Sequence, residues 1–130
     1  MKCFIDANVL FSGANEASQM HRFLIKACAS HQLISSDYAR EEAIRNIRAK
    51  RSDWEYGFTQ LMPHIEIVGS IDQFLEVEIA PEDRPILATA IAQNSNTLIT
   101  GDKKDFAHLF RKTIQGVTVL TPLMFAQGHL

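Results

Sequence analysis

Residues 82–106, EDRPILATAIAQNSNTLITGDKKDF, contain the pattern that decides the fold of this chain. Apolar residues recur with helical spacing over residues 84–94, and the run TLIT at 97–100 has the length and composition of a buried strand. A glycine and an aspartate end that strand, and a further helix is predicted over residues 103–112. A helix, a short buried strand and another helix in direct succession are typical of a parallel sheet covered by helices.

The same alternation of strands and helices continues on both sides of this segment. Strands are predicted at residues 2–5, 33–35, 65–68, 97–100 and 117–120. Helices are predicted at residues 17–31, 37–50, 54–62, 84–94, 103–112 and 122–127. Residues 69–80 fit a helix and a loop equally well. The expected fold class is therefore α/β, with a central parallel sheet of about five strands sandwiched between helices.

The length and composition are those of one ordinary folded domain, spanning residues 1–130. The chain has 130 residues, of which 46% are apolar and 22% are charged, as in a globular protein with a hydrophobic core. Its apolar stretches are too short to cross a bilayer, and its start lacks the features of a signal peptide. Cys3 and Cys28 lie in apolar segments without metal-type spacing, so both are predicted to be buried thiols. We therefore expect a cytoplasmic protein without a membrane partner.

Charge is distributed unevenly along the chain. The net charge is −2, which argues against a protein that holds nucleic acid by bulk electrostatics. Residues 66–83 contain six acids and no lysine or arginine, whereas basic residues gather at 40–51 and 103–112. Such a cluster is most often the solvated face of a helix. Because both basic groups adjoin candidate acidic residues, they also suggest contacts with the phosphates of a nucleic acid, and the candidates are Arg45, Arg48, Lys103 and Lys104.

Four acids follow or border apolar runs, namely Asp6, Glu42, Asp83 and Asp102. Because the ends of parallel strands share one rim of the sheet, acids far apart in sequence can meet there. Carboxylates about 4 Å apart repel by roughly 1 kcal/mol in water, and by roughly 4 kcal/mol at an effective dielectric constant near 20. Such a group therefore either keeps protons or binds a divalent cation. Taken singly, each acid also has an ordinary interpretation as a helix cap, a charge near a helix start or half of an ion pair.

The choice between two adjacent glutamates decides one position of this group. Neighbouring helix residues point about 100° apart, so only one of Glu41 and Glu42 can face a cleft. Glu42 lies closer to the buried face, as judged from its spacing to Ala39 and Ala43, and is therefore preferred. Asp105 lies three residues after Asp102. Taken alone, it would be interpreted as an ordinary acid on the protein surface.

Other chemistries have weaker support in the sequence. There is no glycine-rich phosphate loop, no HExxH pair and no GxSxG nucleophile motif. The five histidines show no ligand spacing. An all-carboxylate site favours Mg²⁺ or Mn²⁺ over zinc.

Four segments together resemble the PIN-domain nucleases, a family that includes the VapC-like toxin ribonucleases of type II toxin–antitoxin systems. They are FIDANVLFSG at 4–13, SSDYAREEAIRNI at 35–47, EDRPILATAIAQNSNTLITGDKKDF at 82–106 and VTVLTP at 117–122. The D-R-x-I-L-x-x-A and T-G-D-x-x-D-F patterns carry most of the specificity, whereas D-x-N alone is weak.

The resemblance implies a small three-layer α/β/α sandwich that cleaves RNA with Mg²⁺ or Mn²⁺. It also implies a homodimer and a cognate antitoxin as partner. The family's catalytic acids correspond to Asp6, Glu42, Asp83 and Asp102, and its metal ligands to Asp6, Asp83, Asp102 and the accessory Asp105. Asn8 and Thr100 correspond to polar positions that support the site.

Two other functions stay open. One is a PIN-like module that binds RNA or protein without catalysis, against which the four retained acids argue. The other is a phosphohydrolase with Asp6 as nucleophile, which would ordinarily have a second aspartate where Asn8 stands.

The segment 54–62 is a candidate for partner binding. It contains Trp54, Tyr56, Phe58, Leu61 and Met62, which are more large apolar residues than one stripe of a short helix can bury. Exposed aromatic patches usually mark an interface, so the segment, with part of the helix 37–50, is predicted to pack against a second copy or an antitoxin peptide. Packing of the same residues into the core is the alternative.

Overall fold

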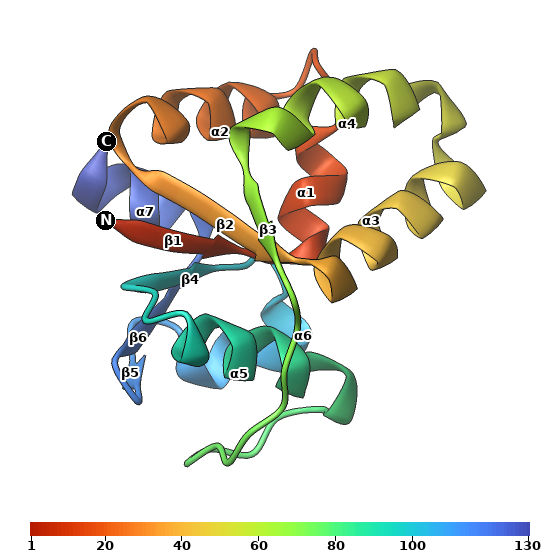
Figure 1. The fold of residues 1–130 in the computed structure, drawn as a ribbon. Helices are drawn as coiled ribbons and strands as arrows, with labels where there is room; N and C mark the ends of the chain where they lie inside the picture. Colours follow the sequence, from red (N-terminus) through yellow and green to blue (C-terminus); the bar gives the residue numbers. More distant parts are fainter.

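Five short parallel strands form the centre of the molecule (Figure 1). The computed structural model describes all 130 residues. The parallel strands are β1 (Lys2–Ile5), β2 (Gln32–Ser36), β3 (Glu66–Val68), β4 (Thr97–Ile99) and β6 (Val117–Leu120). A two-residue strand, β5 (Thr113–Ile114), adds an antiparallel edge, so that the order across the sheet is β3-β2-β1-β4-β6-β5. The predicted parallel sheet of about five strands is confirmed, and β5 is an addition to it.

Helices cover both faces of this sheet. In Figure 1, α1 to α4 lie above the sheet, and α5 and α6 lie below it. The helices are α1 (Ala7–Gly13), α2 (Gln19–Ser30), α3 (Asp37–Lys50), α4 (Glu55–Leu61), α5 (Arg84–Ala92), α6 (Lys103–Phe106) and α7 (Pro122–His129). Single 3₁₀ turns are formed by Ser52–Trp54, Met62–His64, Pro81–Asp83 and Ala107–Leu109. The structure is thus a three-layer α/β/α sandwich, as predicted.

Burial and capping explain why these segments adopt these elements. The central strands are hidden on both faces: Cys3, Phe4 and Ile5 of β1 are fully buried, as in a sheet covered on both sides. Ser36 accepts a hydrogen bond from the backbone N–H of Ala39 and so caps α3, which confirms the predicted helix start. Thirty-one buried hydrophobic residues form one continuous core.

One helix was not predicted, and another is shorter than predicted. Helix α1 follows β1 without a loop and has only seven residues, too few for a helical period to stand out in the sequence. The predicted helix at 103–112 ends at Leu109, because Phe110 pairs with Val119 as an isolated parallel bridge and Arg111 has a φ of 68°. Phe106, Leu109 and Phe110 nevertheless have helical spacing, which made the longer helix plausible.

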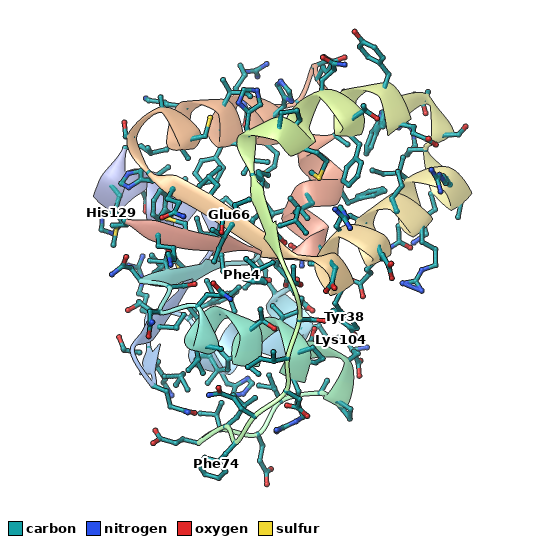
Figure 2. The ribbon with its side chains drawn as sticks, viewed as in Figure 1. Phe4, Tyr38, Glu66, Phe74, Lys104 and His129 are labelled. Carbon is teal, nitrogen blue, oxygen red and sulfur yellow. The ribbon has the colours of Figure 1, made fainter.

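Residues 69–80 form no helix or strand. Arg84 holds this segment by a 3.2 Å ion pair with Asp72 and a 2.8 Å hydrogen bond to the Gln73 carbonyl. Leu75 is buried, whereas Phe74 is 75% exposed and projects from the bottom of the view in Figure 2. The segment is therefore a loop tied down by side-chain contacts.

Most of the apolar side chains of segment 54–62 pack into the molecule. Phe58 and Leu61 are buried, and the Trp54 ring lies 5.2 Å from that of Phe11, centroid to centroid. Only Tyr56 is largely exposed, at 68%. The segment therefore lacks the broad exposed patch on which the predicted interface depended.

Two further expectations concern the cysteines and the membrane. Both cysteines are free thiols; Cys3 is buried as predicted, but Cys28 is only half-buried. Its Sγ donates to the Ile25 carbonyl at 3.1 Å, and its side chain packs against the edge of the core. None of the helices has the length and apolar character that a membrane span requires.

Candidate metal centre at the carboxyl rim of the sheet

Asp6 is fixed at the point where β1 passes directly into α1. Its backbone N–H donates to the Ile99 carbonyl of β4 at 3.0 Å, so the ends of two adjacent parallel strands are held together. Its Oδ1 accepts from the Ala7 N–H at 2.6 Å, and its Oδ2 accepts from the Thr100 hydroxyl at 2.8 Å. The side chain is only 4% exposed. Burial raises the pKa of Asp6 to about 6, although the hydrogen bonds from Thr100 and Ala7 oppose the rise.

A small polar network joins Asp6 to the segment after β4. The amide oxygen of Asn8 accepts from the Gly101 N–H at 3.0 Å. The Thr100 hydroxyl accepts from the Asp102 N–H at 3.1 Å while it donates to Asp6. Asn8 and Thr100 therefore join the segment after β1, where Asp6 lies, to the segment after β4, where Asp102 lies.

Asp83 and two neighbouring acids form a group with ligand-like spacing. Carboxylate oxygens of Glu82, Asp83 and Asp105 all lie within 4.8 Å of one another. Asp83 is 8% exposed, and its Oδ2 is buried without a hydrogen-bond partner. Burial, followed by the adjacent Asp105 carboxyl, raises the pKa of Asp83 to about 8; Asp6 and Asp102 contribute in the same direction. A buried polar atom without a partner is costly, so this oxygen needs a proton or a cation.

Asp102 and Asp6 also cap helices, as their ordinary interpretation requires. Asp102 Oδ1 accepts from the Asp105 N–H at 3.0 Å at the start of α6, and Asp6 accepts from Ala7 at the start of α1. Asp83 precedes α5 but makes no capping hydrogen bond. Helix capping therefore explains one hydrogen bond of Asp6 and one of Asp102. It does not explain why Asp83 is buried.

Glu42 faces this group from α3, whereas Glu41 is exposed. Burial raises the pKa of Glu42; Arg45 opposes the rise, and the carboxylates of Asp102 and Glu82 add to it. Ligand-like spacing thus joins Asp83 and Asp105 with Glu82. Asp6, Asp102 and Glu42 lie outside that spacing but near enough for their charges to raise the pKa of Asp6, Glu42 or Asp83.

The predicted RNA-binding basic residues differ in whether they are free to contact a phosphate near the acids. Lys103 and Lys104 are exposed at the start of α6, directly after Asp102, and Arg45 is exposed one turn after Glu42. Arg48 is engaged elsewhere, in a 3.1 Å ion pair with Glu55. In Figure 2, the labelled Tyr38 and Lys104 both lie at the edge of the sheet where α3 begins.

The donor set fits a hard divalent cation. The ion pairs of the molecule are Arg48–Glu55, Arg51–Asp53 and Arg84–Asp72, and none of them involves the clustered acids. All the candidate ligand atoms are carboxylate oxygens, which suit Mg²⁺ and Mn²⁺. The unpartnered Asp83 oxygen is the atom that such an ion would satisfy.

Comparison with solved structures identifies the fold. A chain of VapBC2 from Rickettsia felis, bound to a DNA fragment from their promoter, superposes with a TM-score of 0.68 at 16% identity, covering 93% of this chain and 98% of that one. VapBC-1 from nontypeable Haemophilus influenzae matches with a TM-score of 0.60 at 13% identity, covering 95% and 99% of the two chains. The chain has a VapC-like PIN-domain fold. No protein-family model matches the sequence, and no curated protein matches it either.

Two residues outside the predicted set contribute to the acidic rim of this PIN-like fold. Glu82 enters the ligand-like group beside Asp83. The Tyr38 hydroxyl donates to the Glu82 carbonyl at 2.7 Å, and burial together with Glu42, Asp83 and Glu82 raises the pKa of Tyr38. Tyr38 lies four residues before Glu42, one helical turn away, and that spacing is the signal that would have found it.

Proposed function

We propose that this protein is a Mg²⁺- or Mn²⁺-dependent endoribonuclease of the cytoplasm and the toxin of a toxin–antitoxin pair. The observation that carries the proposal is the group of carboxylates formed by Glu82, Asp83 and Asp105, in which the buried Asp83 Oδ2 has no hydrogen-bond partner. The toxin assignment draws on the likeness to chains of two VapBC complexes. A cognate antitoxin and a homodimer belong to the same proposal.

The proposed ligands are Asp6, Asp83, Asp102 and Asp105. When bound, the divalent ion lowers the pKa of a water molecule and neutralises charge on the phosphate. The protein holds the Asp6 carboxylate in one orientation through Thr100 and Ala7, so that little reorganisation accompanies binding. Burial of Asp6 and Asp83 keeps competing water away from these oxygens.

Glu42 is the proposed proton acceptor. It lies at the edge of the cluster, half-buried, with a pKa raised by burial and by Asp102 and Glu82. A carboxylate with a raised pKa is a stronger base than a free one, so Glu42 is suited to take a proton from the attacking water. In-line attack of that water leaves a 5′-phosphate and a 3′-hydroxyl.

The two alternative functions are less compatible with the geometry. A phosphohydrolase with Asp6 as nucleophile would ordinarily have a second aspartate where Asn8 stands, and Asn8 is an amide whose oxygen accepts from the Gly101 N–H. An inactive binding module has no need for buried acids that destabilise one another. RNA binding of normal strength without cleavage in Mn²⁺ would nevertheless support the inactive module.

The proposal is tested by incubating end-labelled single-stranded RNA with the purified protein in Mn²⁺, Mg²⁺ or EDTA. We expect cleavage in either metal and none in EDTA, with products that carry a 5′-phosphate. Products that end in a 2′,3′-cyclic phosphate, or cleavage that persists in EDTA, would contradict a metal-activated water as nucleophile.

The exposed lysines beside Asp102 are expected to bind the RNA backbone. Lys103→Gln and Lys104→Gln should each weaken RNA binding and reduce the slope of log K against log salt by about 1. Arg48→Gln is the matched control, because Arg48 already pairs with Glu55 and should change the slope little. The measurement is fluorescence anisotropy of labelled RNA across a salt series in EDTA. An equal loss in all three variants would mean that the contacts are spread over the surface.

Thr100 is expected to act on metal affinity through Asp6. Thr100→Val removes the hydroxyl that donates to Asp6 Oδ2, so Mn²⁺ affinity should fall by about 10- to 100-fold. Thr100→Ser should restore most of it. Thr113→Val is the control, because its hydroxyl pairs with Thr118 at the far edge of the sheet. Unchanged Mn²⁺ affinity in Thr100→Val, measured by calorimetry, would show that Thr100 does not position Asp6 for the ion.

A further inference from the structure

An open groove runs between α2 and α7 beside the acidic rim. Its volume is about 470 Å³, within the range of small-ligand sites. The walls are largely apolar: Met20 and Phe23 come from α2, and Leu123 and Ala126 from α7. The two helices are in contact at the left of Figure 1. Leu123 is 67% exposed, so an apolar wall faces solvent here.

The groove adjoins the segment that carries Asp102. Gly101 and Lys103 line the groove, and Asp102, which lies between them in the chain, is near enough to Asp83 for its charge to raise the pKa of Asp83. The same short segment therefore contributes to the groove and to the acidic rim. Lys103 places a positive charge at the junction, which suits an anionic strand that passes from the acids into the groove.

We propose that this groove holds one unstacked base of the RNA, adjacent to the phosphate that is cleaved. The inference rests on the proposed function, which it deepens by adding a base-binding subsite. A base has two apolar faces and a polar edge. Phe23 and Met20 offer apolar contact to the faces, and Gln19 and Thr121 line the same groove with polar atoms for the edge. The charge of Lys103 favours a nucleotide over an apolar peptide side chain.

The test combines filling the groove with removing the base. Ala126→Phe places a ring in the groove, and Gln127→Phe places the same ring on the adjacent, exposed position of α7 outside it. The substrates are a short RNA and a series of copies with one abasic nucleotide moved along the strand. For wild type, one abasic position next to the cleaved phosphate should lower kcat/KM by about tenfold.

The effects of Ala126→Phe and of the abasic nucleotide on kcat/KM are expected not to be additive. Ala126→Phe should lower kcat/KM for intact RNA by about tenfold and should show no further loss with the abasic RNA. Gln127→Phe should behave as wild type. Leu123→Ala removes part of the groove wall at an exposed position and should lower kcat/KM by a smaller factor, about threefold. This variant replaces Ala126→Phe in the test if Ala126→Phe does not fold.

Measurements of RNA binding test this inference independently of the proposed cleavage activity. Anisotropy of the same RNAs in EDTA should show the same non-additive pattern, and it does so without any cleavage. Equal losses for intact and abasic RNA, or no loss in any variant, would overturn the base subsite while leaving the ribonuclease intact. A change in molecular mass by light scattering in Ala126→Phe, with RNA binding unchanged, would assign the groove to a second copy instead. Absence of cleavage by wild type in Mn²⁺ would contradict the ribonuclease and leave the binding comparison valid.

Discussion

Replacing Asp83 by asparagine is expected to reduce RNA cleavage by about a thousandfold or more, a loss typical of a central catalytic group. The same variant should be as stable as wild type without metal, or more stable. Asp83 has a pKa of about 8 and an oxygen without a partner, so at neutral pH the metal-free carboxyl is largely protonated. Asparagine has the same shape and no charge, and it therefore removes a ligand without adding strain. Cleavage in Mn²⁺ and thermal unfolding in EDTA are measured on the same preparation.

The adjacent glutamates of α3 supply the matched control. Glu42→Gln should lose most activity, because Glu42 faces the cluster, whereas Glu41→Gln should keep it, because Glu41 is exposed. A marked fall in the melting temperature of Asp83→Asn would instead show that Asp83 stabilises the fold and would remove the reason for assigning it to a metal. Equal activity of the two glutamine variants would remove Glu42 from the site.

The second large effect is a pH-dependent gain in stability on removing Asp6. In the folded protein the pKa of Asp6 is about 6, whereas free aspartate has a pKa of about 3.9. Between these values the folded state binds more protons than the unfolded state, so this group lowers the free energy of unfolding as the pH rises. Above about pH 6 the full penalty is present, roughly 3 kcal/mol; below about pH 4 it is absent.

Comparing Asp6→Asn with wild type measures this contribution together with the repulsion between Asp6 and Asp83, because Asp6 also raises the pKa of Asp83. In EDTA the melting temperature of the variant should exceed that of wild type by roughly 10 °C at pH 8, and the difference should vanish near pH 4. Adding Mn²⁺ at pH 8 should stabilise wild type and not the variant, since a bound ion favours the ionised carboxylates. A melting-temperature difference that does not change with pH would mean that burial does not raise the pKa of Asp6.

The sheet was predictable because its strands are short, apolar and separated by amphipathic segments. VTVL at 117–120 and TLIT at 97–100 have no competing interpretation, and both are strands in the structure, over Val117–Leu120 and Thr97–Ile99. Once the sheet is parallel, the ends of β1 and β4 must share a rim, which is why Asp6 and Asp102 lie near each other. The meeting of these acids thus follows from strand order, although their roles in catalysis stay predictions.

The features that escaped prediction depend on tertiary contacts. In the sequence, Arg48 cannot be told apart from a basic residue that is free to bind a phosphate. Only the fold shows that it forms an ion pair with Glu55. The Trp54 segment has an excess of apolar residues, but contacts such as that with Phe11, on another helix, bury them. The groove between α2 and α7 joins residues more than a hundred positions apart, and no local pattern marks it.

Measuring Mn²⁺ binding and RNA cleavage in one titration tests the central claim most directly. The free-ion signal by electron paramagnetic resonance gives bound Mn²⁺, and labelled RNA in the same samples gives the cleavage rate. We predict that the rate rises in proportion to bound ion and saturates with it, and that Asp83→Asn neither binds the ion with wild-type affinity nor cleaves. Cleavage before any ion is bound, or a fully bound ion without cleavage, would contradict the assignment of this cluster as the metal centre of a ribonuclease.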